Sequence, residues 1–136
     1  MLALQKLKAA DHMLTMTYPL VEDPKILLAV LENIQASMDN AIHDKLLKAR
    51  QEKKIPRYSE TAQGRYAAFM EHLAKKYSKN AIRHIKEVYE ILQEHKKSPV
   101  EFRRKEMFII CDDKYRTKAL SEATLREYIE TAKELL

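Results

Sequence analysis

The chain has 136 residues with one Gly, four Pro, one Cys and no Trp, and 25 basic against 20 acidic side chains give a net charge of +5. A single glycine cannot build a P-loop, a dinucleotide-binding turn or a nucleophile elbow, which excludes the usual nucleotide folds and the common hydrolase signature. A single cysteine, Cys111, excludes an intramolecular disulfide and a multi-cysteine metal site.

The composition predicts one soluble globular domain over residues 1–136. Hydrophobic residues make up 46% of the chain and charged residues 33%, which is typical of a packed domain with a heavily charged surface. The longest apolar run, Met107–Cys111, is too short to cross a bilayer. The first residues lack the apolar core and cleavage site of a signal peptide. We therefore expect a cytoplasmic protein with no membrane partner.

Two helices are predicted in the first part of the chain. Residues 2–18 carry apolar side chains at helical spacing, and Pro19 should end this helix because the residue before a proline avoids α backbone. Asp23 and Pro24 form a start signal, with a capping side chain followed by proline at the first helical position. The second helix should run from residue 24 to about residue 54, with Pro56 closing it.

A third helix should start at Ser59, which has the side chain of an N-cap. Gly64 near its start costs about 1 kcal/mol relative to Ala, which indicates close packing against another helix. Residues 78–80 are ambiguous: either Asn80 caps a fourth helix, or one long helix continues to Lys97. We favour a break or kink at this point.

The last third of the sequence mixes helix and strand signals. Residues 98–101 (Ser-Pro-Val-Glu) combine an N-cap, a proline and a capping-box glutamate, which predicts a short helix to about Lys105. Residues 107–111 and 115–118 flank a turn-like Asp-Asp-Lys and fit a small β-hairpin, with a buried helix end as the alternative. Ser121 should cap a final helix whose inner face comprises Leu125, Tyr128, Ile129, Ala132 and Leu136. The fold class is therefore mostly α: a single bundle of five or six helices, with or without a short hairpin near residues 106–119.

Two segments carry a family resemblance. Residues 10–21, from Ala-Asp-His to Tyr-Pro-Leu-Val, and residues 98–103 resemble small helical proteins found in archaeal genomes. The resemblance covers about half of the chain. It implies an intracellular, mostly helical protein and no particular activity.

Arg65 and His72 are the candidate catalytic pair. They lie seven residues apart on one helical face, a spacing similar to the Arg-(four to six residues)-His motif of the HEPN family, many of whose members are dimeric, metal-independent ribonucleases. That resemblance implies Arg65 as the phosphate clamp and His72 as the acid or base acting on an RNA 2′-hydroxyl. The residue after the arginine, Tyr66, departs from the polar residue usual in that family. Chance alone yields about one such spacing in this composition.

Basic residues suggest a nucleic-acid surface. Residues 45–57 carry six positive charges against Glu52 alone, and residues 75–86 carry five with no acid. If one helix runs through residue 78, a cationic ridge about 20 Å long would form, suited to phosphates rather than to bases. The ridge comprises His72, Lys76, Lys79, Arg83 and Lys86, and a second patch could include Arg103, Arg104, Lys105, Arg116 and Lys118. A solvated lysine-rich surface is the plainer interpretation, and a break near Ser78 would scatter the ridge. Most tyrosines fall in phase with apolar positions and are expected in the core.

Two further constellations were considered. Glu32, Asp39 and His43 share one face of the second helix, as ligands of a metal in a helical bundle would. The Glu-x-x-His pair of di-iron bundles is absent, so we expect neither metal nor cofactor. Residues 26–34 are apolar on most faces of the same helix, so it is either the centre of the bundle or part of a homodimer interface.

The sequence leaves enzyme and binding protein both open. Our leading hypothesis is a non-enzymatic binding or interaction module that contacts nucleic acid through its basic middle. The candidate binding residues are Lys76, Lys79, Arg83, Lys86, Arg103 and Arg104. The alternative is a HEPN-like ribonuclease that uses Arg65 and His72.

Overall fold

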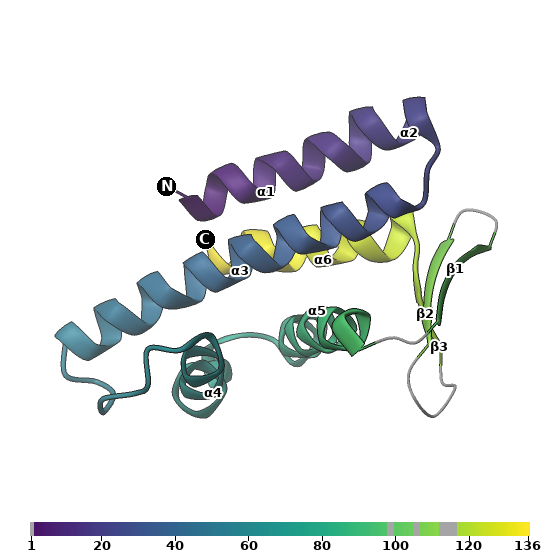
Figure 1. Cartoon of the computed structure of the whole chain (residues 1–136). Coiled ribbons are helices and arrows are strands. Elements are labelled where there is room, and N and C mark those ends of the chain that lie inside the picture. The colour runs from purple at the N-terminus through teal and green to yellow at the C-terminus, as the bar shows by residue number, and fades with distance from the viewer. Residues whose placement is uncertain (1, 98–99, 105–106, 112–116) are drawn as a thin grey trace.

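A computed structural model describes residues 2–97, 100–104, 107–111 and 117–136. The predicted fold class is confirmed, since the chain is mostly helical with a short antiparallel β element (Figure 1). The helices are α1 (Leu2–His12), α2 (Tyr18–Val21), α3 (Lys25–Gln51), α4 (Ala62–His72), α5 (Lys79–Lys97) and α6 (Glu122–Leu135). A π-helical turn, η1 (Met13–Thr17), joins α1 to α2, and a 3-10 turn, η2 (Ala74–Lys76), precedes α5. The strands are β1 (Val100–Arg104), β2 (Met107–Cys111) and β3 (Thr117–Leu120).

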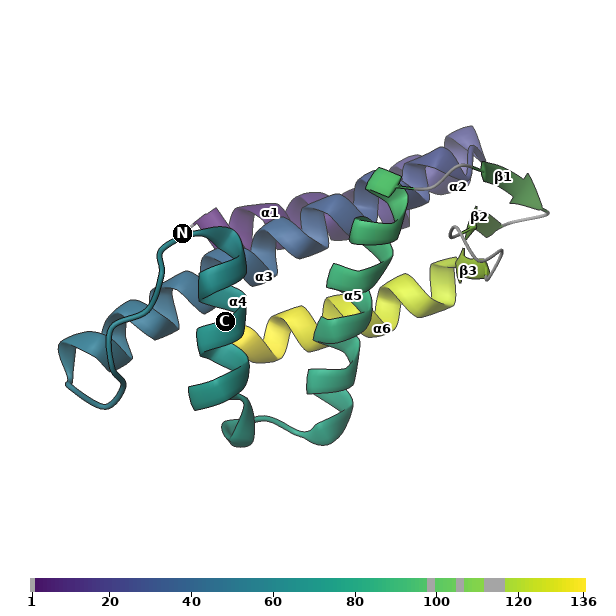
Figure 2. The same ribbon diagram turned by 60° about the horizontal axis from the view of Figure 1, so that its bottom comes forward.

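Helix α3 is the centre of the bundle. It lies antiparallel to α1 (Figure 1), and it also packs against α4, α5 and α6. Figure 2 shows α5 running across α3 and α6. The first turns of α3 have four completely buried side chains, Leu27, Val30, Leu31 and Ile34. Elements of the same chain cover them, so the central position accounts for a helix that is apolar on most faces.

The predicted apolar phase is confirmed along the chain. Leu31, Ile34 and Val88 are fully buried and Leu73 is 5% exposed. Burial of such a stripe is the main stabilising term for a helix in a small domain. A polar contact adds to it where α1 meets α3, since the buried Ser37 hydroxyl donates a 2.7 Å hydrogen bond to the carbonyl of Ala3. Within the described ranges, no helix combines the length and the apolar character needed to cross a membrane.

The prediction that Pro19 ends the first helix was wrong. The helical path continues to Val21, with Pro19 near the start of α2. Proline removes one backbone donor and crowds the preceding turn, and the widened η1 turn comes just before it. There the N–H of Tyr18 bonds to the carbonyl of Met13, five residues back. The helix ends instead at Glu22, which adopts left-handed backbone with φ of 55°.

Helix α3 begins at Lys25, one residue later than predicted, with Pro24 at the N-cap position, and its end comes earlier than expected. The Asp23 carboxylate accepts a 3.0 Å hydrogen bond from the N–H of Lys25, and helical bonding begins at the carbonyls of Asp23 and Pro24. The helix ends at Gln51 rather than near residue 54. Lys53 then takes left-handed backbone with φ of 59°, so the chain turns before it reaches Pro56.

Thr61, not Ser59, caps α4, which corrects the sequence prediction. Its hydroxyl accepts a 3.0 Å hydrogen bond from the N–H of Gly64. The atoms nearest to a Cβ at Gly64 belong to Ser59 in the preceding loop rather than to another helix. A Cβ at this position would lie 2.2 Å from the carbonyl oxygen of Ser59. The glycine is required by the loop that enters the same helix.

The favoured break near residue 78 is present. Helix α4 ends at His72, and α5 begins at Lys79 after the η2 turn. The cap of α5 is Ser78 rather than Asn80, because the Ser78 hydroxyl accepts a 3.1 Å hydrogen bond from the N–H of Ala81.

The short helix predicted over residues 98–105 is wrong at Val100–Arg104, which form strand β1 of a three-stranded sheet. The strand order is β1-β2-β3, and both pairings are antiparallel. Strand β1 pairs with β2 from Val100↔Cys111 to Arg104↔Met107, which supplies long-range backbone bonds that a one-turn helix lacks. The predicted hairpin near 106–119 corresponds to β2 and β3. The predicted cap and proline at 98–99 and the turn at 112–114 lie outside the described residues.

Helix α6 begins as predicted, with the Ser121 hydroxyl accepting a 3.3 Å hydrogen bond from the N–H of Thr124. Four of its five predicted inward residues are buried, but Leu136 is 40% exposed and Leu135 takes its place in the core. A polar link ties α6 to α5, since Nδ1 of the buried His84 lies 2.7 Å from the hydroxyl of Thr131.

Candidate functional site

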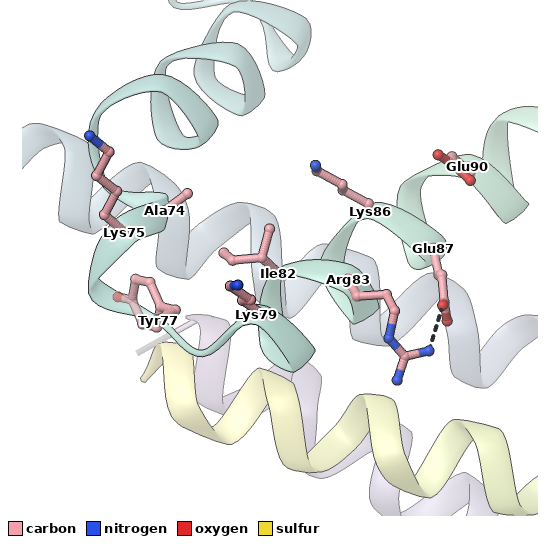
Figure 3. Close-up of a pocket in the computed structure, with 9 residues that line it drawn as sticks. All are labelled: Ala74, Lys75, Tyr77, Lys79, Ile82, Arg83, Lys86, Glu87 and Glu90. Carbon is pink, nitrogen blue, oxygen red and sulfur yellow. Dashed lines mark hydrogen bonds and ion pairs between the residues drawn. The ribbon is translucent and has the colours of Figure 1, made fainter.

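The junction between α4 and α5 redirects the chain and creates a groove. Leu73 is the C-cap of α4, with its N–H bonded to the carbonyl of Phe69, and η2 follows at once. Tyr77 is extended, with φ of −114° and ψ of 158°, and its N–H bonds to the carbonyl of Ala74 at 3.1 Å. The capping Ser78 then starts α5. This path places η2 and Tyr77 beside the first turns of α5 (Figure 3).

The groove has a volume of about 790 Å³ and two kinds of lining. Its apolar lining comes from Ala74, Tyr77 and Ile82. Its charged lining is mostly basic, and Figure 3 shows these side chains around the apolar ones. The charged residues are Lys75, Lys79, Arg83, Lys86, Glu87 and Glu90.

One basic and one acidic side chain of the groove neutralise each other. Arg83 donates a 3.1 Å hydrogen bond to Glu87, one turn later on α5, and a 2.6 Å bond to the side chain of Asn80. The second carboxylate oxygen of Glu87 accepts a 2.8 Å bond from the hydroxyl of Tyr128 on α6. Burial and this contact with Glu87 raise the pKa of Tyr128, which therefore stays a donor at neutral pH.

The three lysines of the groove remain available. Lys75, Lys79 and Lys86 make no ion pair within the part of the chain that the structure describes. An anion could therefore bind these ammonium groups without first breaking an ion pair with a described carboxylate.

The end of α3 carries further positive charge. Glu52, just after α3, forms a 2.8 Å ion pair with Lys54. Its pKa is lowered mainly by this contact with Lys54, and further by the charges of Lys48 and Lys76. Lys76 belongs to η2, so the end of α3 lies within electrostatic reach of that turn. We call the groove-lining lysines Lys75, Lys79 and Lys86 the basic face.

The predicted ridge is therefore wrong in shape. It required one unbroken helix from His72 to Lys86, but these residues are divided among α4, η2 and α5. Lys79, Arg83 and Lys86 share one face of α5 and line the groove. Of the second predicted patch, Arg103 and Arg104 lie on β1, paired with Phe108 and Met107 of β2. Their side chains lie outside the structural description, so their predicted role is untested.

Sequence reasoning missed six of the nine lining residues as site residues, among them Lys75, Tyr77 and Ile82. Lys75 lies in the basic stretch but off the predicted ridge, and Tyr77 was expected in the core. Tyr77 is half-buried, and its ring packs 5.6 Å from that of Phe69. The extended backbone at Tyr77 is the feature that brings the ring to the groove, and no sequence signal specified it.

The candidate catalytic pair does not form a shared contact. Arg65 donates from its guanidinium to the carbonyl of Glu60, and its charge acts on the pKa of Asp39. His72 lies at the other end of α4, with its Nε2 3.7 Å from Glu71. Seven residues correspond to about 10 Å along a helix. Both side chains would therefore have to extend toward the same phosphate to contact it together. Their assignment as ribonuclease residues stays a prediction.

The metal hypothesis finds no support in the described part of the chain, where no group of three or more ligating side chains could hold an ion. Asp39 instead accepts a hydrogen bond from the hydroxyl of Tyr89, whose ring lies 4.5 Å from that of Tyr66. Burial raises the pKa of Asp39, partly opposed by the Tyr89 hydrogen bond and the charge of Arg65. Glu32 is exposed, and His43 lies one turn beyond Asp39 on α3.

Comparisons with protein-family models, curated proteins and solved structures find no significant match to this chain. The resemblances noted from short segments therefore stay predictions, and the site is interpreted from its own geometry.

Proposed function

We propose that the protein is a non-enzymatic module that binds the phosphate backbone of a nucleic acid through its basic face. The observation that carries this proposal is the convergence of Lys75, Lys79 and Lys86 around one groove without ion-pair partners among the described residues. Unpaired lysines at a concave surface raise the local concentration of a polyanion and can each replace a condensed counterion.

Further positive charge lies near η2, since Lys48 and Lys76 both act on the pKa of Glu52. Of the two acids in the groove, Glu87 is already paired with Arg83 and accepts a hydrogen bond from Tyr128.

A salt series with a labelled oligonucleotide tests the proposal. Three phosphate contacts correspond to a slope of roughly −2.1 to −2.7 in log affinity against log salt, or about an 18- to 42-fold loss of affinity between 50 and 200 mM. The double substitution Lys79→Gln and Lys86→Gln should lower the steepness of the slope by about 1.5 to 2. Lys8→Gln, an exposed lysine on α1, is the matched control and should leave the slope close to that of the parent.

Binding that is absent at low salt would refute the proposal. So would a slope that the groove substitutions leave unchanged, because phosphate contacts at the groove must release counterions there.

A further inference from the structure

The apolar side chains that line the groove do not stabilise a bound phosphate. Ala74, Tyr77 and Ile82 lie among lysines, and Figure 3 shows the amino groups of Lys75 and Lys86 on two sides of Ile82. A purely electrostatic surface gains nothing from these three side chains. Their position among the cations indicates a ligand with both an anionic and an apolar part.

Tyr77 is held in place rather than free to swing into solvent. One side of its ring packs against Phe69, which is fully buried. Its backbone is tied to η2 by the bond to the Ala74 carbonyl, and Ser78 fixes the next turn. A ring fixed in this way loses little conformational entropy when a second flat group packs on it. Burial also raises the pKa of Tyr77, so the ring stays neutral in the physiological range.

The groove has the size of a site for a small organic group. Its volume of about 790 Å³ lies in the range of pockets that enclose small ligands, typically 300–1,000 Å³. The carboxylate of Glu90 lines one part of α5 and would repel phosphates there, whereas that of Glu87 is paired with Arg83. Phosphates should therefore follow Lys75, Lys79 and Lys86, and a base should occupy the apolar lining.

We infer that the groove binds unpaired nucleotides, with a base against Tyr77 and Ile82 and the flanking phosphates on the three lysines. This inference rests on the proposed function and narrows it to single-stranded nucleic acid. A duplex keeps its bases stacked internally and offers mainly phosphates and sugars to such a groove. A single strand exposes the faces of its bases, which aromatic side chains bind with little dependence on sequence.

An abasic probe separates base contact from phosphate contact. Fluorescence anisotropy would compare a labelled single-stranded oligonucleotide, the same strand with abasic sites, and the matching duplex, all at one salt concentration. Loss of one stacked base should weaken binding by roughly 5- to 150-fold, while the salt dependence of the abasic strand persists. The duplex should also bind more weakly than the ordinary single strand.

Variants of the ring provide the second arm. Tyr77→Phe keeps the ring and should bind like the parent, whereas Tyr77→Leu keeps an apolar contact with Phe69 and should lose affinity for the ordinary strand but not for the abasic one. Tyr58→Leu is the matched control, because Tyr58 is also half-buried but does not line the groove. Circular dichroism establishes that each variant is folded.

The outcomes distinguish the two proposals. Equal affinity for the ordinary, abasic and duplex probes, with steep salt dependence, overturns the base-binding inference and leaves the phosphate-binding function standing. Absence of salt-dependent binding to every probe overturns both. The probe comparison uses the unmodified protein, so the inference can be refuted even if Tyr77→Leu does not fold.

Discussion

Substitution of Gly64 by alanine tests whether a single close backbone approach determines the entry to α4. Gly64 lies in the first turn of that helix and has no positive φ, so its backbone suits any residue. The added Cβ would lie 2.2 Å from the carbonyl oxygen of Ser59, 2.6 Å from its Cβ and 2.8 Å from its carbonyl carbon. Two of these three atoms belong to the backbone, so a change of rotamer cannot relieve the contact.

Two effects of opposite sign compete in this substitution. Helix propensity alone would stabilise the protein by about 1 kcal/mol, because glycine is the poorer helix former. Forcing a methyl group against a backbone typically costs about 1–3 kcal/mol. The loop must also shift while Thr61 keeps its cap on the N–H of residue 64. We expect steric repulsion to prevail, with a net destabilisation of about 1–2 kcal/mol and a Tm lower by roughly 3–10 °C.

Thermal and urea unfolding monitored by circular dichroism would measure this difference. Gln63→Ala is the control, since Gln63 is exposed on the same helical turn and should change stability by less than about 0.5 kcal/mol. A Gly64→Ala variant as stable as its parent, or more stable, would refute the reasoning, because propensity would then outweigh the predicted clash.

Three further predictions concern other parts of the chain. Ser37→Ala should destabilise the protein by about 0.5–1.5 kcal/mol in urea unfolding, because the buried hydrogen bond from the Ser37 hydroxyl to the carbonyl of Ala3 is lost; an unchanged midpoint would show that this bond adds nothing to stability. Asp39 has a folded pKa raised by burial, so it contributes stability that is present below its ordinary value of 3.8 and is lost as pH rises through the raised value. Asp39→Asn, which can still accept from Tyr89, should therefore gain stability relative to the parent as pH rises from 4 to neutral, and a relative loss in unfolding titrations would contradict this sign. For the ribonuclease alternative, RNA cleavage without metal must disappear in His72→Ala if that residue is the acid or base; cleavage that persists in the variant removes the assignment.

Much of the fold follows from local sequence signals. The apolar phase of each helix, the Asp23–Pro24 start of α3 and the Ser121 cap of α6 depend on residues within one or two turns of each other. Such signals are readable because the helix period and the caps are properties of a short segment. The strand character of residues 107–111 was likewise visible from consecutive apolar and β-branched side chains.

Local signals were wrong where distant partners compete with them. The capping pattern of residues 98–101 indicated a helix, but pairing with Met107–Cys111 satisfies the backbone of Val100–Arg104 as a strand. Pro19 was read as a helix end, yet the helical path continues because η1 widens just before it. Helix α4 is capped by Thr61 rather than by Ser59, because Thr61 carries an equally suitable hydroxyl two residues later.

The candidate site divides in the same way between sequence and structure. Charge counts alone indicated the two basic stretches, and three of the predicted binding residues, Lys79, Arg83 and Lys86, line the groove. The tertiary structure brought Lys76 within reach of the end of α3 and placed Tyr77 among the lysines. A sequence shows how much charge a segment carries and which face of a helix is apolar. Where the chain turns after a helix ends depends on contacts between residues far apart along it, and the turn after α4 placed an apolar groove among the lysines of one basic segment.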